Sequence, residues 1–556
     1  MHEILIIGGY GVFGSRIARL LSQSADFKLL IAGRSLEKAE AFCRELAHPM
    51  AQPVVLDRNL DMATTLRQLR PWLVIDATGP FQGMTDDDYR VASACIHAGT
   101  HYLDIADARS FVEGFSKLDD LAKQHRVVAI TGASSVPALT SAIVAHLGRD
   151  LAPIHDIEIA LSASNRATVG TNVIRAILSY VGKPIPLWQQ AAETAGYGWQ
   201  SLQRRDFHVT GRPSIRNRLV GLCDVPDLRL LPQHFRNCRS VVFRAGAEMT
   251  MQNLLLWLLS WPVRWGWIGS LAPLADVFGT LQRHMGFLGS DRSAFDVRVA
   301  GRAQDGMIER RYSLIADGGD GPWIPCLAAA LLSRHLAKQD DAGEALSFGA
   351  YPAIDVLPLA DFEQAFGAFQ IATEQTERRV APLYAGILQS GWDRLPAAIR
   401  DIHDTNRHCA AEGRATVTRG NSLIAKIAHT IFGFPAAGDD IPVRVDFLPE
   451  GHQETWQRRF GAHRFSSCLS AGTGTGDLSE RFGALAFDFA LLAIQNRLEM
   501  HFRGWRLWGM PLPRLLAPNI HAVETAKEGV FHFDVEITLP FGLPLLRYRG
   551  TMTPKA

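Results

Sequence analysis

Short runs of β-branched and apolar residues alternate with amphipathic segments over the first 130 residues of the chain. The apolar runs predict strands over residues 3–7, 29–32, 53–56, 73–76, 101–105 and 127–130. The segments between them repeat apolar positions at helical spacing and predict helices over residues 15–24, 36–47, 63–69, 89–98 and 110–124. Because strands joined by crossover helices form a parallel, doubly wound sheet, residues 1–150 are predicted to be an α/β domain of the Rossmann type.

The pattern changes after residue 150. Alternating segments predict antiparallel strands over residues 154–160, 216–222, 295–301 and 308–316, with one helix over 171–181. We therefore expect an inserted mixed α+β domain over residues 151–360, with a helix over 326–337 that returns the chain to the first sheet. A polar, acidic stretch follows that helix, and Pro352 and Pro358 lie just beyond it, which indicates a boundary.

The last third of the chain has Gly-rich turns between alternating segments at 443–447, 454–460, 498–507 and 530–539. This pattern predicts a C-terminal, mainly antiparallel β (α+β) domain over residues 374–556. Four aromatic residues on its strands fit a sheet core and are also compatible with a second apolar cavity: Phe502, Trp505, Trp508 and Phe531.

Composition narrows the function classes. The 556 residues contain 57 Lys+Arg and 56 Asp+Glu, so the chain lacks the basic excess of a nucleic-acid-binding protein, and we expect no nucleic-acid partner. The seven cysteines are scattered and form no C-x-x-C pair, which favours neither a disulfide framework nor a structural zinc site. With no acid-rich metal loop and no signal-peptide pattern, we expect a cytoplasmic protein without a metal.

A glycine motif, Gly9-Tyr10-Gly11-Val12-Phe13-Gly14, lies directly after the first predicted strand and opens the first predicted helix. In this context Gly9 permits a tight turn, Gly11 lets a pyrophosphate approach the backbone, and Gly14 allows close packing of helix on strand. The helix N-terminus then faces the phosphates. The motif predicts a dinucleotide site.

The end of the second strand indicates which nucleotide binds. An acid there would bind a ribose 2′-hydroxyl, but the sequence has Gly33-Arg34-Ser35 instead. The Arg34 guanidinium and the Ser35 hydroxyl at a helix N-terminus suit a 2′-phosphate. We therefore predict NADP, with NAD the weaker candidate.

Three further segments end at the same edge of the predicted sheet, where ligands bind in open α/β folds. Asp57 ends the third strand, and there it either accepts a hydrogen bond from an adenine amino group or begins a turn. Thr78-Gly79-Pro80-Phe81 follows the fourth strand and should border the nicotinamide ribose. Ser134 follows the sixth strand and either binds the carboxamide or caps the next helix.

Tyr102 and Asp104 are the candidate catalytic residues. Alternation along residues 101–105 places both on one face of the fifth strand, near its carboxyl end. Either could donate a proton or orient a substrate. In the alternative interpretation Tyr102 packs beneath the sheet edge and Asp104 holds a loop or caps a helix.

An apolar, Trp-rich segment covers residues 254–271. Trp257, Trp261 and Trp265 are spaced four apart, but Pro262, Arg264 and two glycines interrupt the run before it could span a membrane. Three interpretations stay open: a core helix, a lid over an apolar substrate, and a peripheral contact with a lipid surface.

These motifs together resemble the saccharopine-dehydrogenase-like NAD(P)-binding oxidoreductases over roughly the first 360 residues. The segments that carry the resemblance are residues 8–14, 32–35, 78–81, 99–104 and 132–137. The remainder, with Arg458-Arg459-Phe460 and Arg547-Tyr548-Arg549-Gly550, resembles a domain of unknown function that is fused to such reductases in bacteria. The resemblance implies a Rossmann domain, a covering α/β domain and NAD(P)-linked redox chemistry, but it does not imply saccharopine as the substrate.

The sequence therefore favours an NADP-dependent oxidoreductase that acts on a C=O, C=N or C=C bond of an organic, apolar or lipid-like small molecule. We also expect a homodimer. The alternative from another class is a non-catalytic nucleotide-binding protein whose C-terminal domain binds a lipid or a partner. A nucleotide motif does not separate the two, because it reports binding and not turnover.

Overall fold

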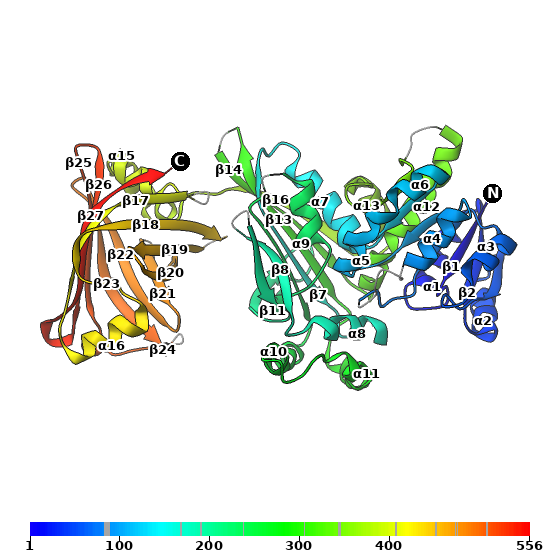
Figure 1. The fold of residues 1–556 in the computed structure, drawn as a ribbon, viewed down its shortest axis with the longest axis horizontal. Helices are drawn as coiled ribbons and strands as arrows, with labels where there is room; N and C mark the ends of the chain where they lie inside the picture. The colour runs from blue at the N-terminus through cyan, green and yellow to red at the C-terminus, as the bar shows by residue number, and fades with distance from the viewer. Residues whose placement is uncertain are drawn as a thin grey trace. The chain divides into compact units, whose positions relative to one another are not determined.

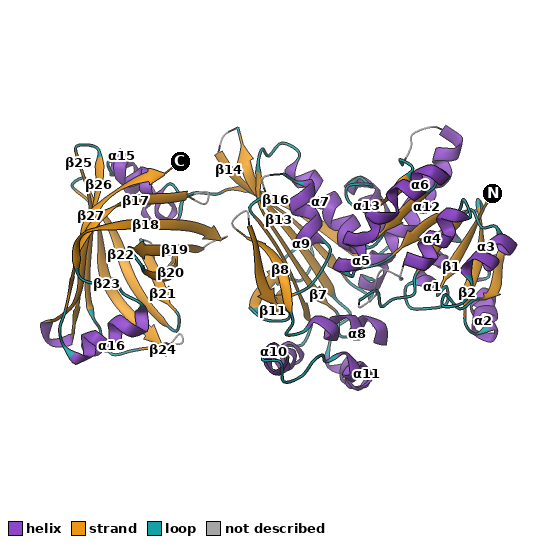
Figure 2. Cartoon of the chain, in the orientation of Figure 1, coloured by secondary structure: helices purple, strands orange, loops and turns teal. Residues whose placement is uncertain are grey.

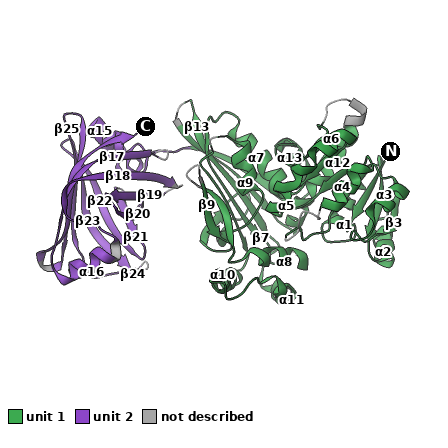
Figure 3. Cartoon of the chain, viewed as in Figure 1, with its two compact units in different colours: residues 1–378 green, residues 379–556 purple. Residues whose placement is uncertain are grey.

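The computed structural model describes residues 1–82, 89–166, 170–189, 192–236, 238–304, 306–342, 346–405, 409–450, 453–472, 474, 476–507 and 510–555. Trp508 lies outside the described residues. The chain divides into two compact units, residues 1–378 and residues 379–556 (Figure 3).

The first unit begins with a parallel sheet of seven strands in the order β15-β6-β5-β4-β1-β2-β3 (Figure 1). Residues 4–7 of the central strand β1 are fully buried, and each such Ile or Leu contributes about 1.5–3 kcal/mol by leaving water. The strands are β1 (His2–Ile7), β2 (Phe27–Gly33), β3 (Ala51–Val55), β4 (Leu73–Asp76), β5 (His101–Asp104), β6 (Val128–Thr131) and β15 (Gly349–Pro352).

Helices pack on this sheet (Figure 2). One of them, α12, brings residues far along the chain against α1, where Arg334 donates a hydrogen bond to the Leu20 carbonyl at 2.7 Å. The helices are α1 (Gly14–Leu21), α2 (Leu36–Leu46), α3 (Met62–Leu69), α4 (Arg90–His97), α5 (Arg109–Gly114), η2 (Phe115–Leu118), α6 (Asp119–His125), η3 (Ser135–Leu139), α7 (Thr140–Gly148), α12 (Ile324–Ala342) and α13 (Leu359–Phe366).

A second, mixed sheet has the order β10-β11-β12-β7-β13-β14-β16, with β7 and β12 parallel and the β8–β9 hairpin attached to β12. Its strands are β7 (Ile154–Ala163), β8 (Pro184–Gln189), β9 (Ala192–Tyr197), β10 (Gln203–Phe207), β11 (Ile215–Leu222), β12 (Ser240–Ala247), β13 (Ser293–Ala303), β14 (Gly306–Ala316) and β16 (Ile371–Arg379). The helices of this part are α8 (Thr171–Tyr180), α9 (Asp227–His234), α10 (Thr250–Arg264), η4 (Ala272–Leu274), α11 (Ala275–Met285), η5 (Gly286–Leu288) and η6 (Gly321–Trp323).

The second unit is an antiparallel sheet of eleven strands in the order β22-β21-β20-β19-β18-β17-β27-β26-β25-β23-β24. Pairing of β22 with β23 closes the sheet into a barrel. The strands are β17 (Cys409–Arg419), β18 (Gly438–Glu450), β19 (Gln453–Phe460), β20 (His463–Ala471), β21 (Asp477–Phe482), β22 (Leu485–Ile494), β23 (Arg497–Leu507), β24 (Met510–Pro511), β25 (Asn519–Lys527), β26 (Val530–Leu539) and β27 (Leu543–Lys555). The helices are α14 (Leu383–Leu388), η7 (Gln389–Arg394), α15 (Ala397–His403), α16 (Leu423–Phe432), η8 (Arg514–Leu516) and η9 (Pro540–Gly542).

The predicted fold class is confirmed: a parallel sheet, a mixed sheet and an antiparallel C-terminal part follow one another along the chain. The sequence predicted six parallel strands, and the structure adds a seventh, β15, in the proline-containing stretch. This strand is only four residues long, lies at the sheet edge and ends at Pro352, so proline costs it no interior hydrogen bond. Closure of the barrel was not predicted, because it depends on pairing between distant strands.

Candidate active site

The glycine motif forms the turn between β1 and α1. A Cβ atom on Gly14 would collide with the carbonyl oxygen of Gly8, and one on Gly11 would lie 3.0 Å from the same oxygen. On Gly9 it would lie 2.9 Å from the Ile6 carbonyl. Glycine is therefore required at these positions by close backbone approach, which is the geometry that a pyrophosphate-binding turn needs.

The end of β2 meets this turn through Tyr10. Its ring fills the space where Gly33 would carry a Cβ atom, and its hydroxyl accepts a hydrogen bond from the Ser35 backbone N–H at 3.0 Å. The Ser35 hydroxyl in turn accepts from the Lys38 N–H at 3.3 Å and caps α2. Sequence reasoning placed Tyr10 only within the motif and missed its contact with Gly33.

Arg34 lies exposed at the edge of this turn. Among the described residues no carboxylate pairs with it. The fork of its guanidinium is therefore available to a phosphate. Asp57, after β3, lies nearby in the cavity wall, where its carboxylate accepts from the Asn59 backbone N–H at 2.9 Å in a local turn.

Arg58, which sequence reasoning missed, holds the loop at residues 78–81. Its guanidinium donates to the Thr78 hydroxyl at 2.8 Å and to the Thr78 carbonyl at 3.1 Å. It also pairs with the fully buried Asp76 at 3.3 Å and lies over the Phe81 ring. From the second sheet's side, the Asn172 amide of α8 donates to the Gly79 carbonyl at 2.6 Å. Two side chains thus fix the loop from opposite sides.

A cavity of about 760 Å³ lies over these segments. Most of the predicted cofactor-binding residues line it: Tyr10, Gly11, Val12, Phe13, Gly33, Arg34, Asp57, Thr78, Gly79, Pro80, Phe81 and Ser134. Gly9, Gly14 and Ser35 are not among the lining residues. The opposite wall comes from α8 and the second sheet and is mainly apolar, with Leu161, Val173, Ala176, Ile177, Val225, Phe243 and Ala245.

Tyr102 and Asp104 lie inside the first sheet and do not line the cavity. Tyr102 is buried against Phe115. One oxygen of Asp104 accepts hydrogen bonds at 2.9 Å from the Ala106 and Gly132 backbone N–H groups and from the Thr131 hydroxyl. Burial raises the pKa of Asp104 to about 7 despite these bonds. The observed geometry therefore gives Asp104 the loop-holding contacts of the alternative interpretation.

Polar side chains that line the apolar half of the cavity include Tyr180, Asp107, Trp199 and Cys223. Tyr180 is half-buried and lies beside the Cys223 thiol. Burial, the Cys223 thiol and nearby Asp107 all raise the pKa of Tyr180 well above its usual range. Asp107 is exposed to the cavity and accepts from Gln82 at 2.9 Å, while burial raises its pKa. No described residue accepts from the buried Trp199 indole N–H.

Sequence reasoning missed Tyr180. The periodicity of a helix does not show which of its turns will lie across a cavity from the glycine turn, which is far away in the sequence. Metal-ligating groups are not clustered here or elsewhere in the described ranges: no three His, Cys, Asp or Glu side chains come together as a metal site would require.

Comparison with known proteins assigns two segments to families. Residues 4–130 match the family model of the saccharopine dehydrogenase NADP binding domain, and residues 395–552 match that of a domain of unknown function, DUF4166. The resemblance inferred from the sequence is thereby confirmed for both segments. The first match supports a dehydrogenase or related oxidoreductase.

The search of solved structures also found similar proteins, and three of them are the following. Saccharopine dehydrogenase (L-Glu forming) from Saccharomyces cerevisiae is 10% identical with a TM-score of 0.48, and the match covers 68% of this chain and 100% of that one. GenD2 from gentamicin A biosynthesis is 12% identical with a TM-score of 0.32, covering 68% and 97%. A Gfo/Idh/MocA family oxidoreductase from Vibrio cholerae is 10% identical with a TM-score of 0.29, covering 62% and 92%. Among curated proteins no sequence matches the chain.

Proposed function

We propose that this protein is an NADP-dependent oxidoreductase that reduces a C=O, C=N or C=C bond of an apolar small molecule. The observation that carries the proposal is the single cavity of about 760 Å³. It joins the glycine turn and Arg34 to an apolar wall that bears Tyr180 and Asp107.

The residues present fit the nucleotide. The glycine turn leaves room for a pyrophosphate that any side chain would fill, and Arg34 meets a 2′-phosphate with an unpaired guanidinium. Thr78 to Phe81, fixed by Arg58 and Asn172, border the space between the phosphate end and the apolar wall. When bound, NADP would supply the hydride chemistry.

Tyr180 is the proposed proton donor. Its hydroxyl lies in the cavity wall beside Cys223, and its raised pKa keeps the proton on the phenol until a strongly basic oxygen or nitrogen develops on the substrate. Because the phenol stays protonated at neutral pH, the phenolate that would take up a proton during oxidation is scarce, and this arrangement favours reduction. Asp107, close enough to raise the pKa of Tyr180, would orient the substrate or replenish the proton.

Nucleotide titration tests the cofactor assignment. We expect Arg34→Ala to weaken NADPH binding roughly tenfold or more, and to leave NADH binding unchanged, since only the phosphate contact is lost. Arg44→Ala is a matched control, because Arg44 lies exposed on α2 and does not line the cavity. Equal affinity for both nucleotides in the wild type would refute the 2′-phosphate assignment.

NADPH oxidation with decanal, 2-decanone and 2-decenal as probes tests turnover. Consumption of NADPH with any of them, lost in Tyr180→Phe, supports an enzyme of this type. If NADPH binds tightly and none of these apolar probes, nor a short polar aldehyde, is turned over, the non-catalytic nucleotide-binding protein becomes the better explanation.

We infer, in addition, that the segment from α10 to η5 rests on a lipid surface. Twelve of the 24 exposed large hydrophobic side chains of the described residues lie in it: Met251, Leu254, Leu255, Leu258, Trp265, Trp267, Ile268, Leu274, Val277, Leu281, Phe287 and Leu288. This exposure argues against a helix buried on all sides over residues 254–271, while Leu256 and Val263 on its other face pack into the core. Within the described chain, none of these exposed residues lines the cavity, which speaks against a lid.

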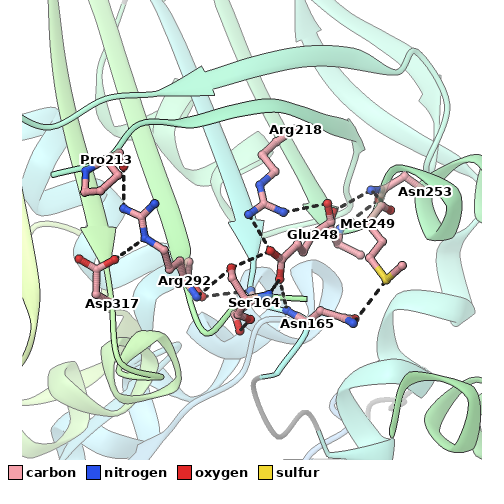
Figure 4. Close-up of polar contacts among 12 residues, drawn as sticks. Ser164, Asn165, Pro213, Arg218, Glu248, Met249, Asn253, Arg292 and Asp317 are labelled. Atoms are coloured by element: carbon pink, nitrogen blue, oxygen red, sulfur yellow. Dashed lines mark hydrogen bonds and ion pairs between the residues drawn. The ribbon is translucent and has the colours of Figure 1, made fainter. Parts of the chain in front are cut away.

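Glu248 holds together the two ends of the segment from α10 to η5 through hydrogen bonds (Figure 4). Its carboxylate accepts hydrogen bonds from Asn165 N–H at 2.8 Å, Ser290 N–H at 2.9 Å and Arg218 at 3.0 Å, so the residues just before α10 and just after η5 share one anchor. Burial acts to raise the pKa of Glu248, but the bonds from Ser290, Asn165 and Arg218 outweigh it and hold the pKa below its usual range.

The segment lies next to the cavity wall. Gly279 of α11 packs against the Ile174 side chain of α8, and the other face of α8 lines the cavity. Figure 1 shows α10 and α11 projecting beside α8. No described helix is long and apolar enough to cross a membrane, so the contact would be peripheral. Such a surface would bring apolar substrates close to the site.

Co-flotation with phosphatidylcholine vesicles tests this contact. Charged residues are sparse between 250 and 288, so we expect binding that barely depends on salt, and loss of binding in Trp267→Glu/Phe287→Glu, where the side chains are 75% and 74% exposed. Leu60→Glu, at a 73% exposed site outside the segment, is the control. If the double variant instead turns a dimer into a monomer in sedimentation, the segment is the interface of the predicted homodimer.

A further inference from the structure

The barrel of the second unit encloses a cavity of about 290 Å³. Side chains on each strand alternate between this interior and the outside; on β19, Glu454, Trp456, Arg458 and Phe460 are buried while their neighbours are more exposed. The volume is about twice that of a 150 Å³ cavity that takes up benzene, so it has room for about a dozen non-hydrogen atoms.

One end of the cavity is apolar and open. Strand register places the end of β26, the start of β27 and the end of β23 together at the end of the barrel where α16 lies. Leu516, which lines the cavity there, is 57% exposed, so the cavity reaches solvent at this end. Trp505, Leu485 and Leu539 surround it.

The other end is closed and polar. Helix α15 lies at the end of the barrel opposite α16 and β24 (Figure 1). His403, its last residue, is fully buried, stacks on Tyr384 with ring centroids 3.9 Å apart and shares a hydrogen bond with Glu524 at 2.7 Å. The Tyr384 hydroxyl is buried in this wall, and no described residue offers it a hydrogen bond.

Two carboxylates face this part of the cavity with capacity to accept more hydrogen bonds. One oxygen of Glu480 accepts hydrogen bonds from the Arg458 guanidinium at 2.9 Å and from the Ser467 hydroxyl at 2.6 Å. Glu524 shares its hydrogen bond with the His403 ring through one carboxylate oxygen only. Among the described residues, no group donates to the second oxygen of either carboxylate.

The charges inside the barrel are unbalanced. Two glutamates that line the cavity, Glu480 and Glu524, face one arginine, Arg458, which is already paired. Glu454 is satisfied by the Thr405 hydroxyl at 2.6 Å and by the Trp456 indole N–H, and burial raises its pKa. An anionic head group would therefore meet two carboxylates at the closed end, whereas a hydrogen-bond donor would meet open acceptors.

We propose that the barrel binds an apolar molecule of about a dozen non-hydrogen atoms whose head group, an amine or an alcohol, donates hydrogen bonds to Glu480 and Glu524 at the closed end. The apolar body lies along the Phe- and Leu-lined wall, and the molecule enters at the Leu516 end. This site is separate from the nucleotide cavity and does not rest on the oxidoreductase proposal.

A matched series of probes on the full chain tests the head group. We expect isothermal titration calorimetry to show binding of decylamine and of 1-decanol, with decylamine binding at a concentration roughly tenfold or more below that of decanoate. In Glu524→Gln, which can still accept from His403, decylamine should weaken roughly tenfold and decanol by less than about threefold. Decanoate binding as well as decylamine would overturn the proposed head group.

A pair of variants on β25 tests the location. Ala522 faces the cavity and His521 faces outward, so Ala522→Phe should abolish binding of the probes and His521→Phe should not. Circular dichroism reports whether Ala522→Phe folds; if it does not, the Glu524→Gln series still decides. Unchanged decylamine binding in folded Ala522→Phe, or in Glu524→Gln, would place the ligand outside the barrel and overturn the proposal.

Discussion

Replacing Asp104 by asparagine separates a structural from a catalytic role for this buried acid. The folded protein holds the pKa of Asp104 at about 7, against an ordinary value near 3.8, chiefly through burial. Asparagine keeps an oxygen for the bonds from Ala106, Gly132 and Thr131 but cannot ionise.

The magnitude follows from linkage. An acid whose pKa is raised on folding is protonated in the folded state while the unfolded chain has already lost the proton. Stability therefore falls as pH rises from about 4 to about 7, by about 1.4 kcal/mol per pKa unit, or about 4 kcal/mol in all. Asp104→Asn cannot ionise, so its stability does not fall in this way as the pH rises. We expect the free energy of unfolding of Asp104→Asn, relative to the wild type, to increase by about 4 kcal/mol between about pH 4 and about pH 8.

Urea unfolding at a series of pH values, followed by hydrogen exchange of peptides from residues 101–131, measures this difference in the first unit. Thr131→Val is the control, because it keeps the carboxyl group and removes a bond that lowers the pKa of Asp104, so its stability should fall with rising pH at least as much as that of the wild type. Parallel curves for Asp104→Asn and the wild type would refute the reasoning. If the variant keeps stability but loses turnover, Asp104 acts in catalysis after all.

Three other substitutions probe the site and its support. Tyr180→Phe should lower kcat for a reducible probe about 100-fold or more and leave the NADPH Kd unchanged, as steady-state kinetics and titration will show. Arg58→Ala leaves Asp76 buried without its cation, so it should destabilise the first unit by about 3 kcal/mol in thermal unfolding and weaken NADPH and NADH equally. Glu248→Ala should make residues 249–289 more sensitive to limited proteolysis. In the wild type the protection should persist at neutral pH and fade only as the pH falls below the ordinary pKa range of a glutamate, because the lowered pKa of Glu248 makes its ionised form the stabilising one.

The nucleotide half of the site could be predicted from the sequence because its signals are local. Gly11 and Gly14 follow a strand at fixed spacing, and Arg34 ends the next strand, so neighbouring residues carry both signals. Arg58 and Tyr180 could not be found this way. Each acts on a residue from another part of the chain, Arg58 on Thr78 and Tyr180 on Cys223, and no periodicity encodes such contacts.

The contrast between local signals and contacts from distant parts of the chain also explains which elements of the fold could be predicted. Long alternating segments predicted strands whose bounds nearly match those of β13, β14 and β23. Strand β15 is too short to show an alternating pattern. The exposed face of α10 was ambiguous in the sequence, because an apolar helix is equally suited to a core and to an external surface until its neighbours are known.

Closure of the C-terminal barrel also bears on aggregation. An open sheet exposes unpaired N–H and C=O groups at its edges, where another chain can add a strand, and a closed ring removes those edges. The short strand β24, which pairs only with β23, is the exception within the described barrel, and it ends at Pro511 with Pro513 just beyond. Because proline cannot donate to a further strand, the remaining edge is protected against edge-to-edge association.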